Sequence, residues 1–460
     1  MPAQPTVLVM AAGHGTRMRS SLPKVLHPVC GRPMLHWVIA AASEAGAGRT
    51  VCVTRAGDGV AEALPDGVES AEQAEGEGTG AAVLAARAKV EAGSTVVILS
   101  GDVPLIAPGL IAGLIAAHDA AGAAATLLTT DQLDPAGYGR IVRAPDGLVE
   151  RIVETKDPSS VPPEELALPE VNVGAYAFDG DALFAALDAV GETGGERYLT
   201  GVFPIIRERG GLVAAHLTPD TLSAMGVNTR VGLMEVERHA QRRIVEAHAL
   251  AGVTFTSPDS TVVDVGVEIG QDTHIGLGVS LRGTTRIGAG CDIGPHTTIT
   301  DSTLGNHVIV PHSYLVEAEV HDGASVGPFA YLRPAASIGA DAKIGTFVEV
   351  KNTRIGEGAK APHLSYLGDA DVGAGANVAA GNITANYDGH DKHRTTIGKR
   401  ARTGVHTSFV APVDVGDDAY TAAGSVITDD VPDGALGISR PEQQNVEGYA
   451  ERVRERPPRE

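Results

Sequence analysis

The chain is poor in cysteine, in aromatic side chains and in positive charge, and these shortages exclude several classes of protein. Its three cysteines, Cys30, Cys52 and Cys291, are odd in number and show no CxxC spacing, so neither a disulfide framework nor a zinc site is indicated. Lys and Arg total 36 against 57 Asp and Glu, which gives a formal net charge of −21. Without a basic surplus to release counterions, binding to nucleic acid or to an acidic membrane is not expected.

Long apolar runs and targeting signals are also missing. The apolar run at residues 6–10 is long enough for one buried strand, but it is far too short for a membrane span or the apolar core of a secretory signal. We therefore expect no membrane span and a cytoplasmic location. The 460 residues leave room for two or three domains.

A glycine-rich loop followed by basic residues comes directly after that apolar run. Residues 11–15 read AAGHG, and Arg17, Arg19 and Lys24 follow. Glycine lets the backbone approach a ligand closely, and free amides beside fixed positive charges bind phosphate groups. The pattern therefore predicts a site for a phosphate-rich ligand.

Up to about residue 228, short apolar runs alternate with alanine-rich helical stretches. The strands are expected at residues 6–10, 95–100 and 124–130, and the helices at residues 34–46 and 110–122. This alternation predicts a parallel, doubly wound α/β sheet, whose ligands lie beyond the carboxyl ends of its strands. The glycine loop would lie there, and residues 229–250 would form a connecting helix.

The second half of the chain has a period of six residues. Aliphatic side chains recur at this spacing from Val263 to Ile299 and, after a reset, from Val326 to Val350. Such hexapeptide repeats predict a parallel β-helix in which each short strand turns one aliphatic side chain inward. The spacing alone does not give its handedness.

Two intervals break this period. Ile355 to Val372 is 17 steps and Val378 to Ile397 is 19, and neither is a multiple of six. We expect an insertion in each interval, the first containing HLSYLGD and the second containing NYDG. Loops that leave a regular solenoid often carry function.

Taken together, these motifs resemble those of a known bacterial family. GxGTRM followed by PKVL, in residues 13–26, is similar to the signature of sugar nucleotidyltransferases, and the repeats with HLSYLGD and NYDG resemble hexapeptide-repeat acyltransferases. In this order they resemble the bifunctional N-acetylglucosamine-1-phosphate uridyltransferases and glucosamine-1-phosphate N-acetyltransferases. The resemblance implies a Rossmann-like uridyltransferase domain (1–228), a linker helix (229–250), and a left-handed parallel β-helix with the acetyltransferase site and a polar tail (251–460).

The resemblance also implies two reactions of UDP-N-acetylglucosamine biosynthesis. Glucosamine 1-phosphate is acetylated with acetyl-CoA as co-substrate, and UMP is then transferred from UTP to N-acetylglucosamine 1-phosphate with release of pyrophosphate. Mg²⁺ at the uridyltransferase site and a homotrimer are implied as well. A displacement between anions needs positioning and positive charge more than covalent catalysis.

For the uridyltransferase site, the matching residues are two cations and two oxygen ligands. Arg17 and Lys24 would face the phosphates, and Asp102 and Asn228 would hold Mg²⁺. The other implied contacts to UTP or the UDP-sugar are Met10, Ala11, Ala12, Gly13, Gln73, Gly78, Thr79, Ser100, Gly101, Gly139, Glu154 and Asn172. Simpler interpretations exist, because a strand-end Asp is commonly a turn or cap, an Asn before a helix an N-cap, and Glu154 beside Lys156 a surface pair.

For the acetyltransferase site, His363 is the implied general base, because the substrate amine must lose a proton to attack the thioester. It is singled out among 16 histidines by its place in the first expected insertion. Arg333 and Lys351 would clamp the sugar phosphate. The other implied contacts are Tyr366, Asn377, Asn386 and Tyr387 for the substrate and Ala380, Ala423 and Arg440 for acetyl-CoA. No cysteine falls in the two expected insertions, which favours direct transfer over an acetyl-enzyme.

Two other kinds of protein share this two-part plan. One is a nucleotidyltransferase with a single activity, whose β-helix is only structural; His363, Arg333 and Lys351 speak against it, because a spacer needs none of them. The other is a non-enzymatic regulator, which would be expected to have lost the basic loop and the carboxylate at Asp102.

Overall fold

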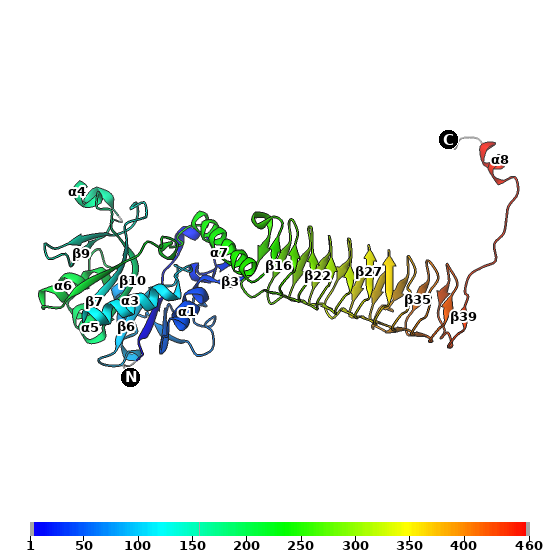
Figure 1. Ribbon diagram of the computed structural model, residues 1–460, viewed down its shortest axis with the longest axis horizontal. Coiled ribbons are helices and arrows are strands. Elements are labelled where there is room, and N and C mark those ends of the chain that lie inside the picture. The colour runs from blue at the N-terminus through cyan, green and yellow to red at the C-terminus, as the bar shows by residue number, and fades with distance from the viewer. Residues whose placement is uncertain (1–3, 156, 457–460) are drawn as a thin grey trace. The chain divides into compact units, whose positions relative to one another are not determined.

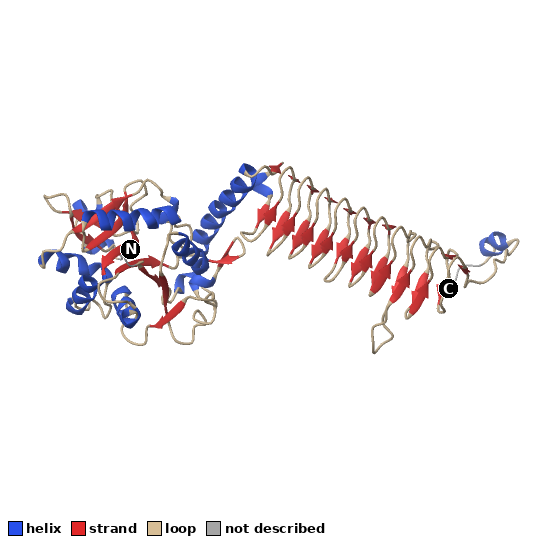
Figure 2. Cartoon of the chain, turned by 60° about the horizontal axis from the view of Figure 1, so that its bottom comes forward, coloured by secondary structure: helices blue, strands red, loops and turns tan. Residues whose placement is uncertain are grey.

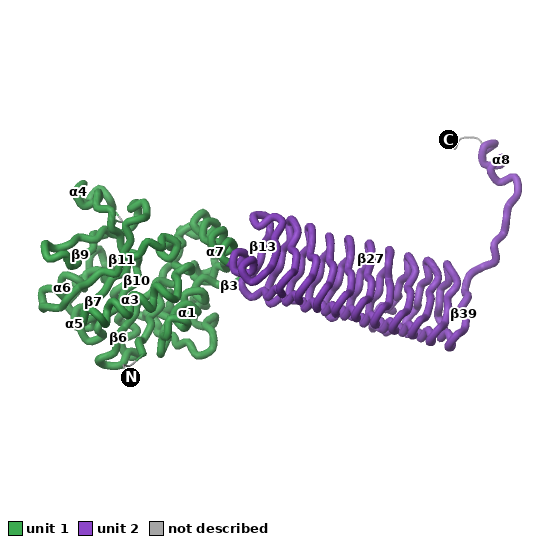
Figure 3. Tube along the Cα trace, in the orientation of Figure 1, with its two compact units in different colours: residues 1–243 green, residues 244–460 purple. Residues whose placement is uncertain are grey.

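The chain divides into two compact units in the computed structural model, which describes residues 4–155 and 157–456 (Figures 1 and 3). Unit 1 comprises residues 1–243 and unit 2 residues 244–460. Residues 1–3, 156 and 457–460 lie outside the described part, and the last of these ranges is the end of the polar tail. Helix α7 (Arg230–Leu250) contains the boundary. Within the described ranges, no helix has both the length and the apolarity needed to cross a membrane.

Unit 1 is built on a nine-stranded sheet with the strand order β11-β7-β10-β6-β1-β4-β5, and β8 and β9 continue from β10. Its strands are β1 (Thr6–Met10), β4 (Arg49–Thr54), β5 (Glu69–Glu72), β6 (Thr95–Ser100), β7 (Ala125–Thr130), β8 (Arg140–Arg143), β9 (Val149–Val153), β10 (Val171–Asp179) and β11 (Val213–Leu217). Its helices are α1 (Met34–Glu44), α2 (Thr79–Ala85), α3 (Pro108–Ala121), α4 (Pro163–Leu166), α5 (Gly180–Ala189) and α6 (Val202–Glu208).

Helices cover both faces of this sheet, and strand β1 shows why the sequence requires it. Leu8 packs into one core with residues of α2, α5 and α6, while Val7 and Val9 pack into the other with residues of α1 and α3. Successive side chains of a strand point to opposite faces, so a strand buried on both faces appears as a continuous apolar run. The α/β prediction for this half is confirmed.

One central strand departs from the expected all-parallel sheet. β10 runs antiparallel to both of its neighbours, β6 and β7, whereas β1 is parallel to β4 and β6. A parallel pair needs a long crossover, usually a helix. Between β7 and β10 the described residues instead form the antiparallel pair β8–β9, a 3-10 turn (Pro158–Ser160) and the four-residue helix α4, so β10 returns beside β7 in the opposite direction.

Unit 2 is a parallel β-helix made of three sheets, as the six-residue period predicts (Figure 2). Val263 pairs with Leu281, 18 residues on, so one coil holds three hexapeptides. The inward aliphatic side chains form one continuous buried core along the unit. This stack of parallel strands agrees with the left-handed β-helix that the family resemblance implies.

The three sheets contain seven, ten and nine strands. The first comprises β12 (Thr254–Phe255), β15 (His274–Ile275), β18 (Asp292–Ile293), β21 (Ile309–Val310), β24 (Ser325–Val326), β27 (Lys343–Thr346) and β30 (Lys360–His363). The second comprises β13 (Val262–Val263), β16 (Ser280–Arg282), β19 (Thr298–Thr300), β22 (Tyr314–Val316), β25 (Tyr331–Leu332), β28 (Glu349–Lys351), β31 (Tyr366–Gly368), β33 (Ile383–Ala385), β35 (Ser408–Val410) and β38 (Val426–Ile427). The third comprises β14 (Glu268–Ile269), β17 (Arg286–Ile287), β20 (Thr303–Leu304), β23 (Glu319–Val320), β26 (Ser337–Ile338), β29 (Arg354–Ile355), β32 (Ala370–Val372), β34 (Thr395–Ile397) and β36 (Val413–Val415).

Only the second of the two expected insertions exists. Ile355 pairs directly with Val372, so the 17-step interval is one ordinary coil that is a residue short, and the predicted first insertion is wrong. Corner turns can lose a residue while the strands keep their pairing, as between Arg286 and Thr303, which pair at a separation of 17 residues. In contrast, Asp371 pairs with Thr396, 25 residues on, and residues 386–394 leave the coil as a projecting loop (Figure 2).

The inward position of Ile344 gives a test of this core. Ile344 on β27 is fully buried, so Ile344→Ala removes packed methylene groups and leaves a cavity. We expect a loss of about 3 kcal/mol in the free energy of unfolding, measured by urea denaturation followed by circular dichroism. Ile309→Ala on the exposed face of the same sheet is the control, with an expected loss under about 0.5 kcal/mol. Equal losses would contradict the register.

Candidate functional sites

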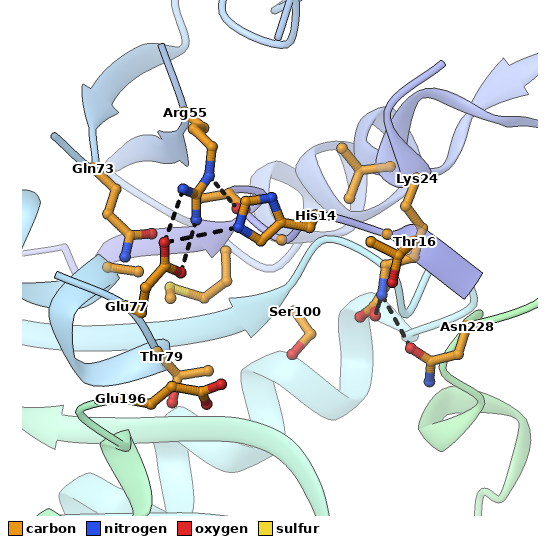
Figure 4. A pocket seen from close by; sticks show the side chains of 18 of the residues that line it. His14, Thr16, Lys24, Arg55, Gln73, Glu77, Thr79, Ser100, Glu196 and Asn228 are labelled. Atoms are coloured by element: carbon orange, nitrogen blue, oxygen red, sulfur yellow. Dashed lines mark hydrogen bonds and ion pairs between the residues drawn. The ribbon is translucent and has the colours of Figure 1, made fainter. Parts of the chain in front are cut away.

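A cavity of about 480 Å³ lies in unit 1 at the carboxyl ends of the parallel strands (Figure 4). Met10 and Ser100, the last residues of β1 and β6, pair with each other and both line it. The glycine loop also lines the cavity, where the sequence predicts it. Gly15 has a φ of +58°, and a Cβ there would lie 2.7 Å from the Lys24 Cβ, so this close approach needs glycine.

On one side of this cavity, the ammonium of Lys24 contacts side chains from two other segments of the chain. Its Nζ donates to a carboxylate oxygen of Asp102, directly after β6, and to Oδ1 of Asn228 at 3.1 Å. Arg17 Nη2 donates to the same Asn228 oxygen at 2.9 Å. Two cations, a carboxylate and an amide oxygen are therefore gathered at one point.

The simpler interpretation of Asn228 as an N-cap does not fit its contacts. The side chain that accepts a hydrogen bond at the start of α7 is Thr229, from the backbone N–H of Gly232 at 3.2 Å, while Asn228 faces Arg17 and Lys24. Glu154 lines the cavity and accepts a hydrogen bond from the Thr200 hydroxyl at 2.9 Å. Lys156, its alternative partner, lies outside the described residues.

Most of the sequence-predicted residues of this half line the cavity. They are Met10, Ala12, Gly13, Arg17, Lys24, Gln73, Gly78, Thr79, Ser100, Asp102, Glu154 and Asn228. Four others lie outside the lining, namely Ala11, Gly101, Gly139 and Asn172. Gly139 accepts a backbone hydrogen bond from Asn172 at 2.9 Å, and the Asn172 side chain donates to the Tyr176 hydroxyl at 2.7 Å.

An ion pair on the other side of the cavity was not predicted. Arg55 donates to both carboxylate oxygens of Glu77, at 3.2 and 3.1 Å, and its Nε donates to the Ala12 carbonyl at 3.2 Å. His14 lies 3.8 Å from the same carboxylate, and Figure 4 shows this group and the Lys24 group on either side of Ser100. The sequence did offer one indication of this pair: Arg55 directly follows β4, so it lies at the carboxyl ends of the parallel strands, where the glycine loop also lies.

In unit 2, one buried carboxylate gathers several of the predicted residues. Asp369 accepts hydrogen bonds from Lys351 Nζ at 3.1 and 3.0 Å, from Asn352 Nδ2 at 2.6 Å, and from the amide of Asn386. The same amide nitrogen of Asn386 lies 3.4 Å from the Tyr366 hydroxyl. Asp369 was not predicted from the sequence, because an acid that follows a glycine has the pattern of any β-helix corner.

The second predicted cation of this unit is held in a similar way. Arg333 Nη1 donates to Glu349 at 2.9 Å, and its guanidinium lies 6.0 Å from the centre of the Tyr331 ring. Hydrogen bonding to Glu349 raises the pKa of Arg333, so this side chain is a permanent cation. Arg333 and Lys351 leave the same sheet on neighbouring coils, β25 and β28.

His363 lies at the end of β30, in an ordinary coil rather than in an insertion. Its side chain is exposed, and its carbonyl accepts a hydrogen bond from the Ser365 hydroxyl at 2.8 Å. Strand β31 runs from its corner towards Asp369, and a strand of three residues spans about 10 Å. One chain thus presents His363 and the Lys351 group at opposite edges of one sheet.

The remaining predicted residues of this unit lie further along the coils. Asn377 is half-buried and bridges to Lys360 and Arg402 on the neighbouring coils. Tyr387, in the projecting loop, donates its hydroxyl to the Gly389 carbonyl at 2.7 Å. Near the end of the β-helix, Arg440 donates to the Ala423 carbonyl at 2.9 Å, and Ala380 is half-buried.

The oxygen atoms beside Lys24 are also the best-suited ligands for a hard cation. Over residues 4–155 and 157–456, no three His, Cys, Asp or Glu side chains gather as a metal site. Asp102 and Asn228 nevertheless direct one carboxylate and one amide oxygen at the same cation, Lys24 Nζ. Magnesium prefers a few such oxygen ligands, completed by water and phosphate. The residues present therefore fit a magnesium ion that shares its ligands with a phosphate substrate.

Comparison with known proteins gives long matches for this chain. The family model of the MobA-like NTP transferase domain matches residues 7–198. The chain is 46% identical over 460 residues to "Bifunctional protein GlmU" of Mycolicibacterium vanbaalenii, covering 97% of this chain and 93% of that one. It is 46% identical over 457 residues to the protein of the same name from Streptomyces avermitilis, covering 97% and 94%. A solved UDP-glucose pyrophosphorylase complexed with UDP-glucose matches 52% of this chain and 100% of its own, at 16% identity and a TM-score of 0.44.

The Arg55–Glu77 pair gives a test of the cavity geometry. Hydrogen bonds from Arg55 hold the pKa of Glu77 below its ordinary value. The ion pair is therefore fully formed at a pH above the ordinary pKa of a glutamate, and it is lost as the pH falls through the lowered pKa. We expect Arg55→Leu to raise the pKa of Glu77 towards about 4.3, measured from its carboxyl ¹³C shift in an NMR titration. The same midpoint in both proteins would contradict the pair.

Proposed function

Because the chain belongs to the GlmU family of bifunctional enzymes, we propose that unit 1 carries its uridyltransferase reaction and unit 2 its acetyltransferase reaction. The chain is a bifunctional enzyme of UDP-N-acetylglucosamine biosynthesis, acting on nucleotide and sugar phosphate substrates. The observation that carries the division is that each unit gathers its own set of fixed cations, Lys24 with Arg17 in one and Lys351 with Arg333 in the other.

In unit 1, a phosphate oxygen of N-acetylglucosamine 1-phosphate attacks the α-phosphorus of UTP, and the bond to the bridging oxygen of the β-phosphate breaks. Lys24 and Arg17 neutralise the charge on the leaving pyrophosphate and hold the phosphates in line. Asp102 and Asn228 would hold Mg²⁺, which supplies further neutralisation when bound. The Lys24 ammonium already places a positive charge between the Asp102 carboxylate and the Asn228 amide oxygen, so it keeps these two ligands in position before substrate binds.

The opposite side of the cavity is suited to the uracil base. Gln73 is buried, and its Nε2 donates to the Gly76 carbonyl at 2.9 Å. This hydrogen bond fixes the position of its Oε1, which can accept a hydrogen bond from a ligand. Gly78 has a φ of +95°, and a Cβ there would lie 2.5 Å from the Arg197 carbonyl oxygen. The turn before α2 therefore requires glycine at this position. Glu154, Gly139 and Asn172 would bind the sugar.

In unit 2, the free amine of glucosamine 1-phosphate attacks the thioester carbonyl of acetyl-CoA directly. His363 accepts the proton that the amine loses, and the CoA thiolate leaves as the amide forms. Arg333 and Lys351 bind the sugar phosphate, while Tyr366, Asn377, Asn386 and Tyr387 orient the sugar. Ala380, Ala423 and Arg440 contact acetyl-CoA.

We also propose that the enzyme is a cytoplasmic homotrimer. An exposed apolar line runs along the corner next to His363: the Phe329 and Phe347 rings stack 5.5 Å apart and are 54% and 59% exposed, and Leu364 continues the line on the next coil. Contiguous exposed apolar surface marks an interaction site. Cyclic symmetry would give three equivalent sites, each able to combine His363 of one copy with Arg333 and Lys351 of another.

A paired assay of two variants tests the division of reactions. His363→Ala should lower thiol release from acetyl-CoA and glucosamine 1-phosphate by about 10³-fold, because it removes the base, with pyrophosphate release unchanged. Asp102→Ala should lower pyrophosphate release from UTP by about a hundredfold or more, with thiol release unchanged.

Wild-type protein is the control for both assays, and it separates the alternatives. Pyrophosphate release without any thiol release would identify a nucleotidyltransferase with a structural β-helix. Loss of both activities in either variant would contradict two independent sites.

Light scattering after size exclusion tests the assembly. The wild type should elute as a trimer, and Phe347→Glu should give smaller species, because it places a charge in the apolar line. Leu217→Glu, at an exposed leucine of unit 1, is the matched control and should stay trimeric. A monomeric wild type, or a trimeric Phe347→Glu protein, would contradict the proposed assembly.

A further inference from the structure

Asp369 is buried, unlike the residues at the same corner of the three preceding coils. The corners stack one coil above another through backbone hydrogen bonds, and they place Glu317, Ala335, Asn352 and Asp369 in sequence, all with φ between 46° and 62°. Glu317, Ala335 and Asn352 are exposed, whereas Asp369 is only 4% exposed. A corner needs no buried charge, and burying a carboxylate costs free energy unless it is fully paired.

The pairing of this carboxylate is complete and reaches three segments. Lys351 Nζ contacts both of its oxygens, Asn352 donates to one of them, and Asn386 donates to the other. Lys351 and Asn352 belong to the preceding coil, while Asn386 is the first residue of the projecting loop. The backbone N–H of Thr395, where the chain rejoins the β-helix, donates to the Asp369 carbonyl at 3.2 Å. Asp369 therefore contacts both ends of this loop.

We propose that Asp369 is the positioning residue of the acetyltransferase site, which fixes the Lys351 ammonium and the Asn386 amide in the arrangement that receives the sugar phosphate. The inference rests on the proposed function, since it takes Lys351 and Asn386 as substrate contacts. Asp369 itself touches no reacting atom; it acts through these two side chains.

The charges and donors support this role. Burial lowers the pKa of Lys351, but its hydrogen bonds, among them those to Asp369, outweigh burial and hold the pKa above the ordinary value. Lys351 thus stays charged in a mostly enclosed place. An ammonium has three donors; two point to Asp369 and the remaining one is directed by them. The Asn386 amide nitrogen is likewise held between Asp369 and the Tyr366 hydroxyl.

The variant Asp369→Asn tests the proposal on the full chain, because it keeps the shape of the side chain and removes its charge. We expect the KM for glucosamine 1-phosphate to rise by about tenfold or more, as loss of a charge-assisted contact would give. The KM for acetyl-CoA and the rate of pyrophosphate release should stay at wild-type values. A merely structural role would move all three together.

Asp371→Asn is the matched control. Asp371 lies two residues further on, in β32, and its side chain is exposed and paired with Arg394 at 2.9 Å. It should leave the KM for glucosamine 1-phosphate unchanged. If Asp371→Asn raises this KM as much as Asp369→Asn does, the proposal is wrong, since any acid on this edge would have the same effect.

The double variant Lys351→Gln/Asp369→Asn covers the case in which the single variant folds poorly. It removes both charges, so no unpaired charge is left buried. Because Asp369 acts partly through Lys351, the two changes should not be independent, and the double variant should raise the KM for glucosamine 1-phosphate by clearly less than the product of the two single effects. Fully multiplied effects of the two changes would overturn the proposal.

The failure of the proposal and the failure of the proposed function give different results. A wild-type protein that transfers no acetyl group would refute the acetyltransferase assignment itself. An active wild type whose KM for glucosamine 1-phosphate is unchanged in Asp369→Asn would refute only the role of Asp369.

Discussion

The structure depends on cations that are held in place by carboxylates from neighbouring elements. A chain with a net charge of −21 must bind anionic substrates against its own field, so its positive charges have to be fixed where they are needed. Lys24 is held by Asp102 in unit 1, and Lys351 by Asp369 in unit 2. The carboxylate of each pair weakens the attraction of the cation for a phosphate, but it also holds the cation in the position from which it can bind one.

The two units reach this arrangement through different kinds of regularity. In unit 1, parallel strands end at one edge, so residues that follow β1, β4 and β6 meet there although they are far apart in the sequence. In unit 2, stacking brings an outward side chain close to those at and beside the paired position on the next coil. Arg333 contacts Glu349 and Lys351 contacts Asp369 in this way, at separations of 16 and 18 residues.

Periodic features of the fold could be predicted from the sequence, but the exceptions to the periods could not. The six-residue period and the glycine loop led to the β-helix and to the cavity, because each reflects burial or backbone freedom that acts at every repeat. An apolar run does not show in which direction its strand runs, so the antiparallel direction of β10 could not be predicted. A coil of 17 residues interrupts the six-residue period just as an insertion does, so the two could not be distinguished. Asp369 was missed because its burial comes from a loop that folds back over it from Asn386.

We propose that the two reactions belong to independent sites, and mixing a variant of each site is the decisive experiment. Asp102→Ala and His363→Ala proteins are each supplied with glucosamine 1-phosphate, acetyl-CoA, UTP and Mg²⁺, first separately and then together, and UDP-N-acetylglucosamine is measured. We expect almost no product from either protein alone and abundant product from the mixture, because the acetylated intermediate made by one is used by the other. No product from the mixture, with each remaining half-reaction intact, would contradict it.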